Sequence, residues 1–309
     1  MVRVKDPKAS LYFYEEILGM KVIATVENES GKFTLYFLAF VNENDAAALD
    51  TKSEGERRIY ALSRSGVLEL THNWGTENDA DFSYANGNKE PGRGFGHIAI
   101  TVDNVEEACK RLESFGDKIK WVKRLTDGKM KNIAFIADPD GYWVEITDLK
   151  TYEFNHTMVR VKDPKASLYF YEEILGMKLI TTMDNENGKF TLYFLAYVNE
   201  TDAAALDTKP KDERRMYAFN RPGVLELTHN WGTENDADFS YANGNKEPGR
   251  GFGHIAVIVD NIEEACKRFE SFGDKVKWVK RLTDGNMKNI AFITDPDGYW
   301  VEILNRAFI

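Results

Sequence analysis

The sequence predicts an α+β protein made of four βαβββ modules, arranged as two tandem domains with mixed sheets. The first observation behind this prediction is an internal repeat. Shifting the 309-residue chain by 157 positions aligns residues 1–146 with residues 158–303 without a gap, and 125 of these 146 positions are identical. The second observation is that each copy contains two helix-like segments, each with one strand-like segment before it and several after it. We therefore expect domains at residues 1–150 and 151–309.

The first half of the second copy is predicted as a strand, a helix and three strands. Residues 156–161 alternate between apolar and polar side chains, as a half-buried strand does. A helix is expected between Pro164 and Gly176, because Pro is tolerated in a first helical turn and Gly favours the residue after a last turn. Its apolar residues recur along one stripe. Three further strands are predicted at residues 190–198, 215–220 and 224–229.

The second half of that copy repeats the same order of elements. Residues 253–259 form an apolar run that predicts a strand, and residues 262–272 form an amphipathic helix that Gly273 ends. The Asp-Pro-Asp-Gly strings at 138–141 and 295–298 are typical of tight turns between strands. The remaining strands of this half are predicted at residues 277–281, 289–294 and 299–304.

Composition excludes several classes of function. A formal net charge of −10 argues against a nucleic-acid-binding surface, which needs clustered Lys and Arg. No apolar run approaches the roughly 20 residues of a membrane helix, and the N-terminus shows no secretory signal. Cys109 and Cys266 lie at equivalent positions inside helix-like segments and are interpreted as buried thiols of a reducing compartment. We expect a cytoplasmic protein.

Strands of each copy carry isolated histidine or glutamate residues that are candidate metal ligands. Strand alternation places Glu69 on one face with Thr71, and His97, Glu145 and His156 near the ends of other strands. Two neutral imidazoles and two carboxylates suit Zn²⁺ or Ni²⁺ better than Mg²⁺. The repeat adds Glu226, His254 and Glu302.

Each of these residues can also be interpreted as an ordinary solvated or structural side chain without a metal. A single Glu on a strand most often lies on a solvated face, and a lone His is more often structural than a ligand. The candidates are far apart in sequence, and no short signature such as His-Glu-x-x-His joins them. The residues alone therefore leave both interpretations standing.

Longer strings in both copies change this balance. They run in order through nearly the whole chain: Thr-Met-Val-Arg-Val-Lys-Asp-Pro, Phe-Tyr-x-x-x-Leu-Gly-Met, Leu-Glu-Leu-Thr-His-Asn-Trp-Gly, Arg-Gly-Phe-Gly-His-Ile and Asp-Pro-Asp-Gly-Tyr-Trp-Val-Glu-Ile. Together they resemble glyoxalase I, a family of the vicinal-oxygen-chelate fold with paired βαβββ modules that form clefts. The duplication resembles the fused, monomeric form found in yeasts. The resemblance thus implies a monomer with two internal active sites.

The resemblance implies that each metal site takes ligands from both copies. One site would join His156 and Glu226 to His97 and Glu145, and the other would join Glu69 to His254 and Glu302. Zinc is the expected ion because the long loops resemble the zinc-type members, and nickel is the alternative.

The two sites are expected to bind metal unequally. Met1 aligns with Met158, so the given sequence has no counterpart of His156 for the second site; either the chain is truncated at that point or a water takes the fourth position. We expect the His156 site to hold its ion more tightly. Metal counting with a three-ligand variant as control tests this, and two equally tight ions per chain would contradict it.

The implied reaction converts the hemithioacetal of methylglyoxal and glutathione into S-D-lactoylglutathione through an enediolate. A divalent ion would act as a Lewis acid, and Glu145 or Glu302 as the base. Glu226 and Glu69 lie opposite these bases and would handle the other substrate enantiomer.

Glutathione carries two carboxylates and one ammonium, so its site requires placed cations and amides. Asn286 stands where the first copy has Lys129, which removes one charge from the second site. For Lys123, simple exposure to solvent is an equally open interpretation. By matched motifs, the glutathione residues would be Arg160, Asn230, Arg93, Lys123, Lys129 and Met130 at one site and Arg3, Asn73, Arg250, Lys280 and Met287 at the other.

Two other functions were weighed against this one. A dioxygenase of the same fold would use a 2-His-1-carboxylate iron site, but each predicted site here has a second carboxylate. A metal-free module that sequesters a small ligand would not need four strand-borne ligands. Oxygen uptake with a catechol would reveal the first alternative, and an assay with and without chelator the second.

Overall fold

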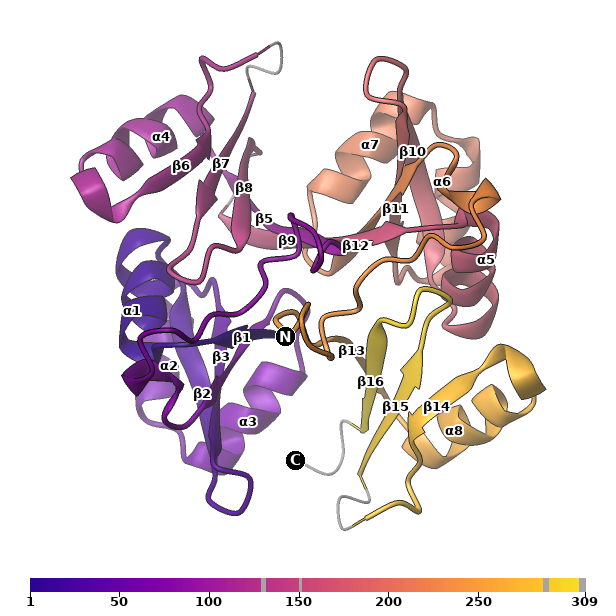
Figure 1. Ribbon diagram of the computed structural model, residues 1–309, viewed down its shortest axis with the longest axis horizontal. Coiled ribbons are helices and arrows are strands. Elements are labelled where there is room, and N and C mark those ends of the chain that lie inside the picture. Colours follow the sequence, from indigo (N-terminus) through magenta and orange to yellow (C-terminus); the bar gives the residue numbers. More distant parts are fainter. Residues whose placement is uncertain (129–131, 150–151, 286–288, 306–309) are drawn as a thin grey trace.

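The computed structural model describes residues 1–128, 132–149, 152–285 and 289–305 of the chain. Figure 1 shows four modules around a common centre, and on the outer sides of these modules lie α1 (Pro7–Leu11), α4 (Val105–Glu113), α5 (Pro164–Tyr169) and α8 (Ile262–Glu270). This arrangement confirms the predicted α+β class with mixed sheets.

Helix starts follow ordinary capping chemistry. Asp6 and Asp163 accept hydrogen bonds from the first turns of α1 and α5, each of which begins with a proline. Asn104 and Asn261 do the same for α4 and α8. The α-helices are α1 (Pro7–Leu11), α2 (Glu43–Asp50), α3 (Glu54–Leu62), α4 (Val105–Glu113), α5 (Pro164–Tyr169), α6 (Glu200–Thr208), α7 (Lys211–Phe219) and α8 (Ile262–Glu270).

Shorter helical turns extend or follow these helices. The π-helical turns η1 (Tyr12–Ile17) and η4 (Phe170–Ile174) continue α1 and α5. The 3₁₀ turns are η2 (Thr76–Asn78), η3 (Gly116–Lys118), η5 (Thr233–Asn235) and η6 (Gly273–Lys275).

Three sheets result, and the largest joins the two copies. The outer sheets have the orders β1-β4-β3-β2 and β13-β16-β15-β14, and the central eight-stranded sheet has the order β10-β11-β12-β9-β5-β8-β7-β6. The strands are β1 (Val2–Val4), β2 (Lys21–Asn28), β3 (Phe33–Ala39), β4 (Leu68–Asn73), β5 (Phe95–Val102), β6 (Lys120–Lys123), β7 (Ile133–Ala137), β8 (Trp143–Asp148), β9 (Glu153–Val161), β10 (Lys178–Asn185), β11 (Phe190–Ala196), β12 (Val224–Asn230), β13 (His254–Val259), β14 (Lys277–Lys280), β15 (Ile290–Thr294) and β16 (Trp300–Asn305).

The antiparallel pairing of β5 with β9 makes the central sheet continuous. In its register Ala99 lies opposite His156, and His97 lies opposite Met158. Strands β5–β8 come from the first copy and β9–β12 from the second, so one sheet is built from halves of both copies. Side chains of both copies can therefore meet on one face of it.

One predicted strand was wrong, and one strand was missed. Residues 215–220, predicted as a strand, lie mainly in α7 (Lys211–Phe219), because a short apolar run cannot be assigned to strand or helix by periodicity alone. The missed strand is β10 (Lys178–Asn185), whose alternation is broken by a register shift between Leu179 and Thr181. The module still has the predicted number of strands, because one strand was predicted in excess and one was missed.

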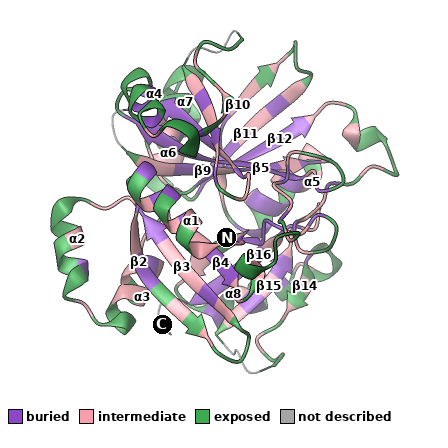
Figure 2. Ribbon diagram, turned by 60° about the vertical axis from the view of Figure 1, so that its left-hand side comes forward, coloured by how far each residue is buried: buried purple, intermediate pink, exposed green. Residues whose placement is uncertain are grey.

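The core runs without interruption between the copies. Phe95 and Phe252 stack with ring centroids 4.9 Å apart and ring planes 12° apart, and they belong to one buried cluster that includes residues of all four modules. Gly94 lies against this contact, and a Cβ there would come within 2.0 Å of the carbonyl oxygen of Ala242. Figure 2 shows the strands mostly buried or intermediate, whereas α2 is mostly exposed.

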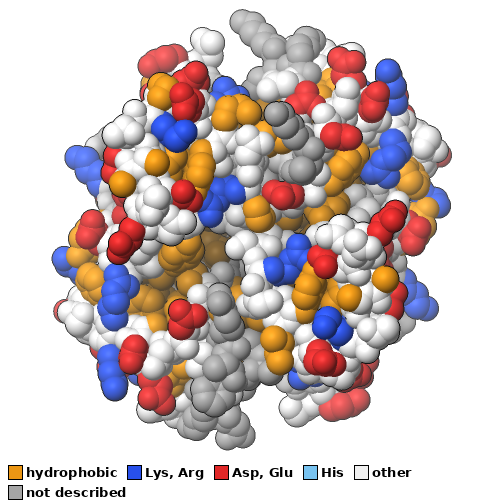
Figure 3. All heavy atoms as spheres, turned by 180° about the vertical axis from the view of Figure 1, so that it is seen from behind, with side chains coloured by type: hydrophobic (Ala, Val, Ile, Leu, Met, Phe, Trp, Pro, Cys, Tyr) orange, Lys and Arg blue, Asp and Glu red, His pale blue; other side chains and the backbone are white. Residues whose placement is uncertain are grey.

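The surface mixes charged and apolar side chains. On the face shown in Figure 3, acidic and basic side chains are interspersed, with hydrophobic side chains between them. Among the described residues, no helix is long and apolar enough to cross a membrane.

The Asp-Pro-Asp-Gly turns tie the two modules of each copy together. The carboxylate of Asp138 accepts hydrogen bonds from the Tyr14 hydroxyl (2.9 Å) and the Tyr142 backbone N–H (2.8 Å). Burial, followed by the charge of the neighbouring Asp140, raises the pKa of Asp138 to about 7. The same causes raise the pKa of Asp295 in the second copy to about 8.

These two aspartates predict a loss of stability as the pH rises from about 4 to about 8. Because their pKa values are raised in the folded state, they favour folding below about pH 4 and progressively cease to do so as the pH rises through 7 and 8. By pH 9 the loss is roughly 4 kcal/mol for Asp138 and roughly 6 kcal/mol for Asp295, at about 1.4 kcal/mol per unit of pKa shift. We expect Asp138→Asn with Asp295→Asn to gain stability relative to the wild type as pH rises from 5 to 9, measured by urea unfolding.

A surface carboxylate provides the control for this measurement. Asp117→Asn changes an exposed residue and should leave the pH dependence of the wild type unchanged. A constant difference between the double variant and the wild type from pH 5 to 9 would contradict the prediction.

Candidate metal centre

Four neighbouring strands of the central sheet direct one ligand-type side chain each toward a common point. These strands are adjacent in the order β12-β9-β5-β8, and they carry Glu226, His156, His97 and Glu145. All four side chains are buried. Residues of the same face recur at every second position of a strand, so a shared face on neighbouring strands brings them together.

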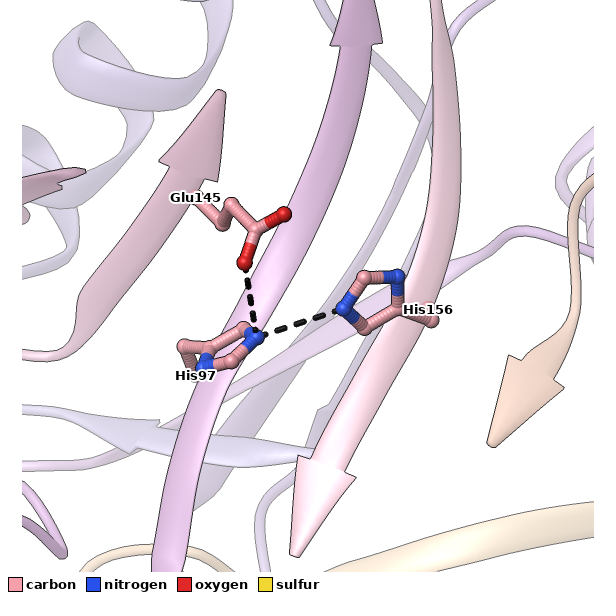
Figure 4. A group of neighbouring side chains, drawn as sticks. All are labelled: His97, Glu145 and His156. Carbon is pink, nitrogen blue, oxygen red and sulfur yellow. Dashed lines mark hydrogen bonds and ion pairs between the residues drawn. The ribbon is translucent and has the colours of Figure 1, made fainter. Parts of the chain in front are cut away.

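The distances define a tight cluster, three members of which appear in Figure 4. Nε2 of His97 lies 3.2 Å from Nε2 of His156 and 3.3 Å from a carboxylate oxygen of Glu145. Nε2 of His156 lies 3.1 Å from a carboxylate oxygen of Glu226. The ligand atoms of His97, Glu145 and His156 all lie within 4.8 Å of one another.

This cluster fits a divalent cation. Two ring nitrogens that face each other can offer their lone pairs to one cation, and two buried carboxylates need a positive partner. Burial alone lowers the pKa of His156, but hydrogen bonding and charge from Glu226 raise it above its usual value. Burial likewise opposes ionisation of Glu226, yet its pKa is lowered by the hydrogen bond and charge of His156. The site thus attracts positive charge, and imidazole with carboxylate is a donor set of Zn²⁺ and its neighbours.

A second cluster has the same construction across the two outer sheets. Glu69 of β4, His254 of β13 and Glu302 of β16 place their ligand atoms within 4.8 Å of one another. Nε2 of His254 lies 3.1 Å from Glu302 and 3.5 Å from Glu69. It is buried and makes no well-directed hydrogen bond within the described part of the chain, so it is available as a ligand. Burial lowers the pKa of His254, but the two carboxylates raise it above its usual value.

Each cluster therefore draws on both copies. Glu69 and His97, which belong to one stretch of the first copy, lie in different clusters. Glu69 meets His254 and Glu302 of the second copy, whereas His97 and Glu145 meet His156 and Glu226.

The candidate glutathione residues Arg160 and Asn230 lie beside the first cluster and are already held by neighbouring groups. Nη1 of Arg160 donates to the carbonyl oxygens of Gly87 (3.2 Å) and Phe95 (3.0 Å), and its Nη2 donates to Asn88. Nδ2 of Asn230 donates to the Tyr241 hydroxyl (2.8 Å). Arg160 is thus fixed against the Gly-rich loop of the first copy.

Arg93 adds a second positive charge near Arg160. Burial, and then the charge of Arg93, lowers the pKa of Arg160. The pKa of Arg3 in the second site is lowered in the same way, by burial and then by the charge of Arg250. The Arg3 guanidinium donates hydrogen bonds to the carbonyl oxygen of Gly244 and to Oδ1 of Asn245. Two guanidinium groups close together favour an anionic ligand between them.

The remaining candidates are held by neighbouring groups or lie outside the described residues. Nζ of Lys123 donates to the carbonyl oxygen of Ile133 (2.7 Å), and Nζ of Lys280 donates to that of Ile290 (2.8 Å). Asn73 donates to the hydroxyl of Tyr84 at 2.9 Å, as Asn230 does to Tyr241. Lys129, Met130 and Met287 lie outside the described residues.

Sequence reasoning missed several polar neighbours of the ligands. Thr228 donates to a carboxylate oxygen of Glu226 (3.1 Å), and Thr71 donates to Glu69 (3.3 Å). A signal existed, because a Thr two residues after a Glu shares its strand face. Asn155, which contacts His156, gave no such signal, because adjacent residues of a regular strand point to opposite faces.

Comparisons with known proteins agree with this geometry. The sequence profile of the Glyoxalase/Bleomycin resistance protein/Dioxygenase superfamily matches residues 1–146 and 153–303. The chain is 49% identical to a lactoylglutathione lyase of Schizosaccharomyces pombe, with 99% of this chain and 95% of that protein covered. It is 45% identical to glyoxalase I of Saccharomyces cerevisiae, with 100% and 91% covered.

A bacterial relative and a solved structure extend the comparison. A lactoylglutathione lyase of Pseudomonas aeruginosa is 56% identical over 156 residues, which is 50% of this chain and 84% of that protein. The crystal structure of glyoxalase I from Zea mays superimposes with a TM-score of 0.70 at 26% identity, covering 99% of this chain and 90% of the other.

Proposed function

The chain belongs to the glyoxalase I family of the Glyoxalase/Bleomycin resistance protein/Dioxygenase superfamily, and on this premise we propose that both buried clusters are metal-dependent active sites. The protein is a lactoylglutathione lyase. Its substrate is the hemithioacetal that methylglyoxal forms with glutathione, and its product is S-D-lactoylglutathione. The convergence of His97, Glu145 and His156, matched by Glu69, His254 and Glu302, is the observation that carries this proposal.

One residue of the first cluster would act both as a ligand and as the base. His97, His156, Glu226 and Glu145 would hold a divalent cation, which when bound would supply a Lewis acid for the charge that develops on the substrate oxygens. Glu145 would take the proton from the carbon next to the carbonyl and return it to the neighbouring carbon, so that no proton is lost overall. Its carboxylate lies 3.3 Å from His97 Nε2, whereas that of Glu226 lies 3.1 Å from His156 Nε2 and also accepts a hydrogen bond from Thr228. Among the described residues the Glu145 carboxylate is therefore the less constrained of the two.

The repeat implies the same roles for the equivalent residues of the second cluster. Glu302 would be its base, with His254 and Glu69 as ligands. Glu69 and Glu226, on the strands opposite the two bases, would serve the other enantiomer of the hemithioacetal.

The glutathione part would lie along the arginines beside each cluster. Arg160 with Arg93, and Arg3 with Arg250, supply paired positive charge for the two carboxylates of the tripeptide. Asn230 and Asn73 supply amides at the ends of β12 and β4. Lys123 and Lys280 would contribute positive charge at the rims.

Zinc is our proposed ion and nickel the alternative, since histidine and carboxylate ligands accept either. A monomer is proposed because both clusters are assembled within one chain. Cytoplasmic placement is proposed from the two free buried thiols, Cys109 and Cys266.

Metal reconstitution tests the proposed function. Apo-protein prepared with a chelator should be inactive, and Zn²⁺ or Ni²⁺ should restore formation of S-D-lactoylglutathione from methylglyoxal and glutathione. His72 and His229 give matched controls, because each pairs with a glutamate outside the clusters. We expect His97→Gln with His254→Gln to abolish the activity and His72→Gln with His229→Gln to retain it. Chelator-resistant activity, or oxygen uptake with a catechol instead, would overturn the proposal.

A further inference from the structure

Asn155 is a buried amide that joins a metal-ligand candidate to the end of a helix. Its side chain is 1% exposed and lies at the start of β9, directly before His156. Oδ1 of Asn155 lies 2.7 Å from Nδ1 of His156. Nδ2 of Asn155 lies 3.1 Å from the carbonyl oxygen of Ala218, 2.9 Å from that of Phe219 and 2.6 Å from that of Arg221.

The three carbonyl groups determine which way the amide points. They come from the C-terminal end of α7 and the residues after it, where carbonyl oxygens lack partners within the helix. A carbonyl oxygen only accepts hydrogen bonds, so the atom of Asn155 that faces three of them must be the NH₂ group. The reversed amide would place four acceptor oxygens together in a buried position.

The orientation of the amide in turn determines where the proton of His156 lies. Oδ1 of Asn155 only accepts, so the facing Nδ1 of His156 must carry a hydrogen. In the neutral ring the lone pair is then on Nε2, the atom that lies 3.2 Å from His97 and 3.1 Å from Glu226. Phe194 and Phe219 pack edge-on against the His156 ring and limit its rotation.

We infer that Asn155 is a positioning residue that holds His156 in the Nδ1–H tautomer with Nε2 directed into the first cluster, and that it transmits this constraint from the C-terminus of α7. The inference rests on the proposed metal site. Groups that hold the second nitrogen of a ligand histidine raise metal affinity, and their loss typically weakens binding by about 10- to 100-fold. Substituting Asn155 should therefore weaken metal binding at the first cluster without touching any ligand.

Two substitutions separate positioning from a merely structural role. Asn155→Ala removes both the acceptor for His156 and the donor to α7. Asn155→Asp keeps the acceptor and loses the donor. Arg221→Ala is the matched control. Arg221 follows the same helix α7, and its side chain donates to the Tyr197 carbonyl oxygen and the Tyr217 hydroxyl rather than to His156. This variant should reduce stability and leave the tautomer of His156 unchanged.

The experiment measures the tautomer and the affinity for Zn²⁺ separately. Nitrogen-15 NMR of the metal-free protein above the pKa of His156 reports which ring nitrogen carries the proton, and only five histidines contribute. Competition with a chromophoric chelator gives the Zn²⁺ affinity, in a His254→Ala background that leaves only the first cluster complete. We expect Nδ1–H for the wild type, Asn155→Asp and Arg221→Ala, and a loss of that form with about 10- to 100-fold weaker binding for Asn155→Ala.

The outcomes distinguish this inference from the proposed function. Wild-type affinity and an unchanged tautomer in Asn155→Ala would overturn the inference while leaving the metal site in place. A wild-type protein that binds no Zn²⁺ at the first cluster would overturn both. If Asn155→Ala does not fold, Asn155→Asp decides, because loss of the Nδ1–H signal there contradicts the assigned role.

Discussion

Replacing Glu145 and Glu302 together by Gln is expected to lower turnover by about 10²- to 10⁴-fold, the usual contribution of a positioned acid or base. The amide cannot take up the proton that each carboxylate is proposed to remove. Each side chain is nearly isosteric with the original, so the strands β8 and β16 should keep their positions. The measurement is the rate of S-D-lactoylglutathione formation by protein loaded with metal.

Two active sites in one chain make the single variants informative. Glu145→Gln alone should leave the activity of the second site, and Glu302→Gln alone that of the first. Glu113→Gln is the control, because Glu113 is exposed and pairs with Arg124, away from both clusters. A double variant with near-normal turnover would refute the assignment of the bases, whereas a single variant without any activity would show that the sites cannot work alone.

Removing the metal is expected to reduce the stability of the fold as well as its activity. The ligands come from strands far apart in sequence and meet only in the folded chain, so the cation binds the folded state in preference to the unfolded one. At a free metal concentration of about 1,000 times the dissociation constant, each site adds about 4 kcal/mol to the free energy of unfolding. Urea unfolding with Zn²⁺ and with chelator measures the difference.

The control for this result removes one histidine from each cluster. His97→Ala with His254→Ala should unfold at the same urea concentration with metal and with chelator. His72→Gln with His229→Gln should keep the full shift, since neither residue belongs to a cluster. An equal metal-dependent shift in the first double variant would place the binding site elsewhere in the protein.

Much of the fold could be predicted from local patterns. The helix from Pro164, the Gly-Phe-Gly-His strand and the Asp-Pro-Asp-Gly turns follow from capping, periodicity and turn chemistry, which depend on neighbouring residues. The error at 215–220 arose where the local pattern was ambiguous. Helix α7 forms there because it packs on β10 and β11, and its tertiary contacts decide between two locally acceptable structures.

The candidate metal site also combines features that local patterns predict with features that depend on tertiary contacts. The repeat and the types of ligand can be read directly from the sequence. The strand face of each ligand can be predicted as well, because side-chain direction alternates with a fixed period of two. The family resemblance then indicated which ligands belong together. Only the tertiary structure decided the distances between them, because these depend on which strands become neighbours across hundreds of residues of chain.

Glu69 and His97 illustrate the point, since they are close in sequence and lie in different clusters. The pairing of β5 with β9 takes His97 to the second copy, while β4 stays in the outer sheet with β1. Asn155 is the further case that no local pattern indicated. Its importance arises from three carbonyl oxygens more than sixty residues away, which only the packed end of α7 brings to it.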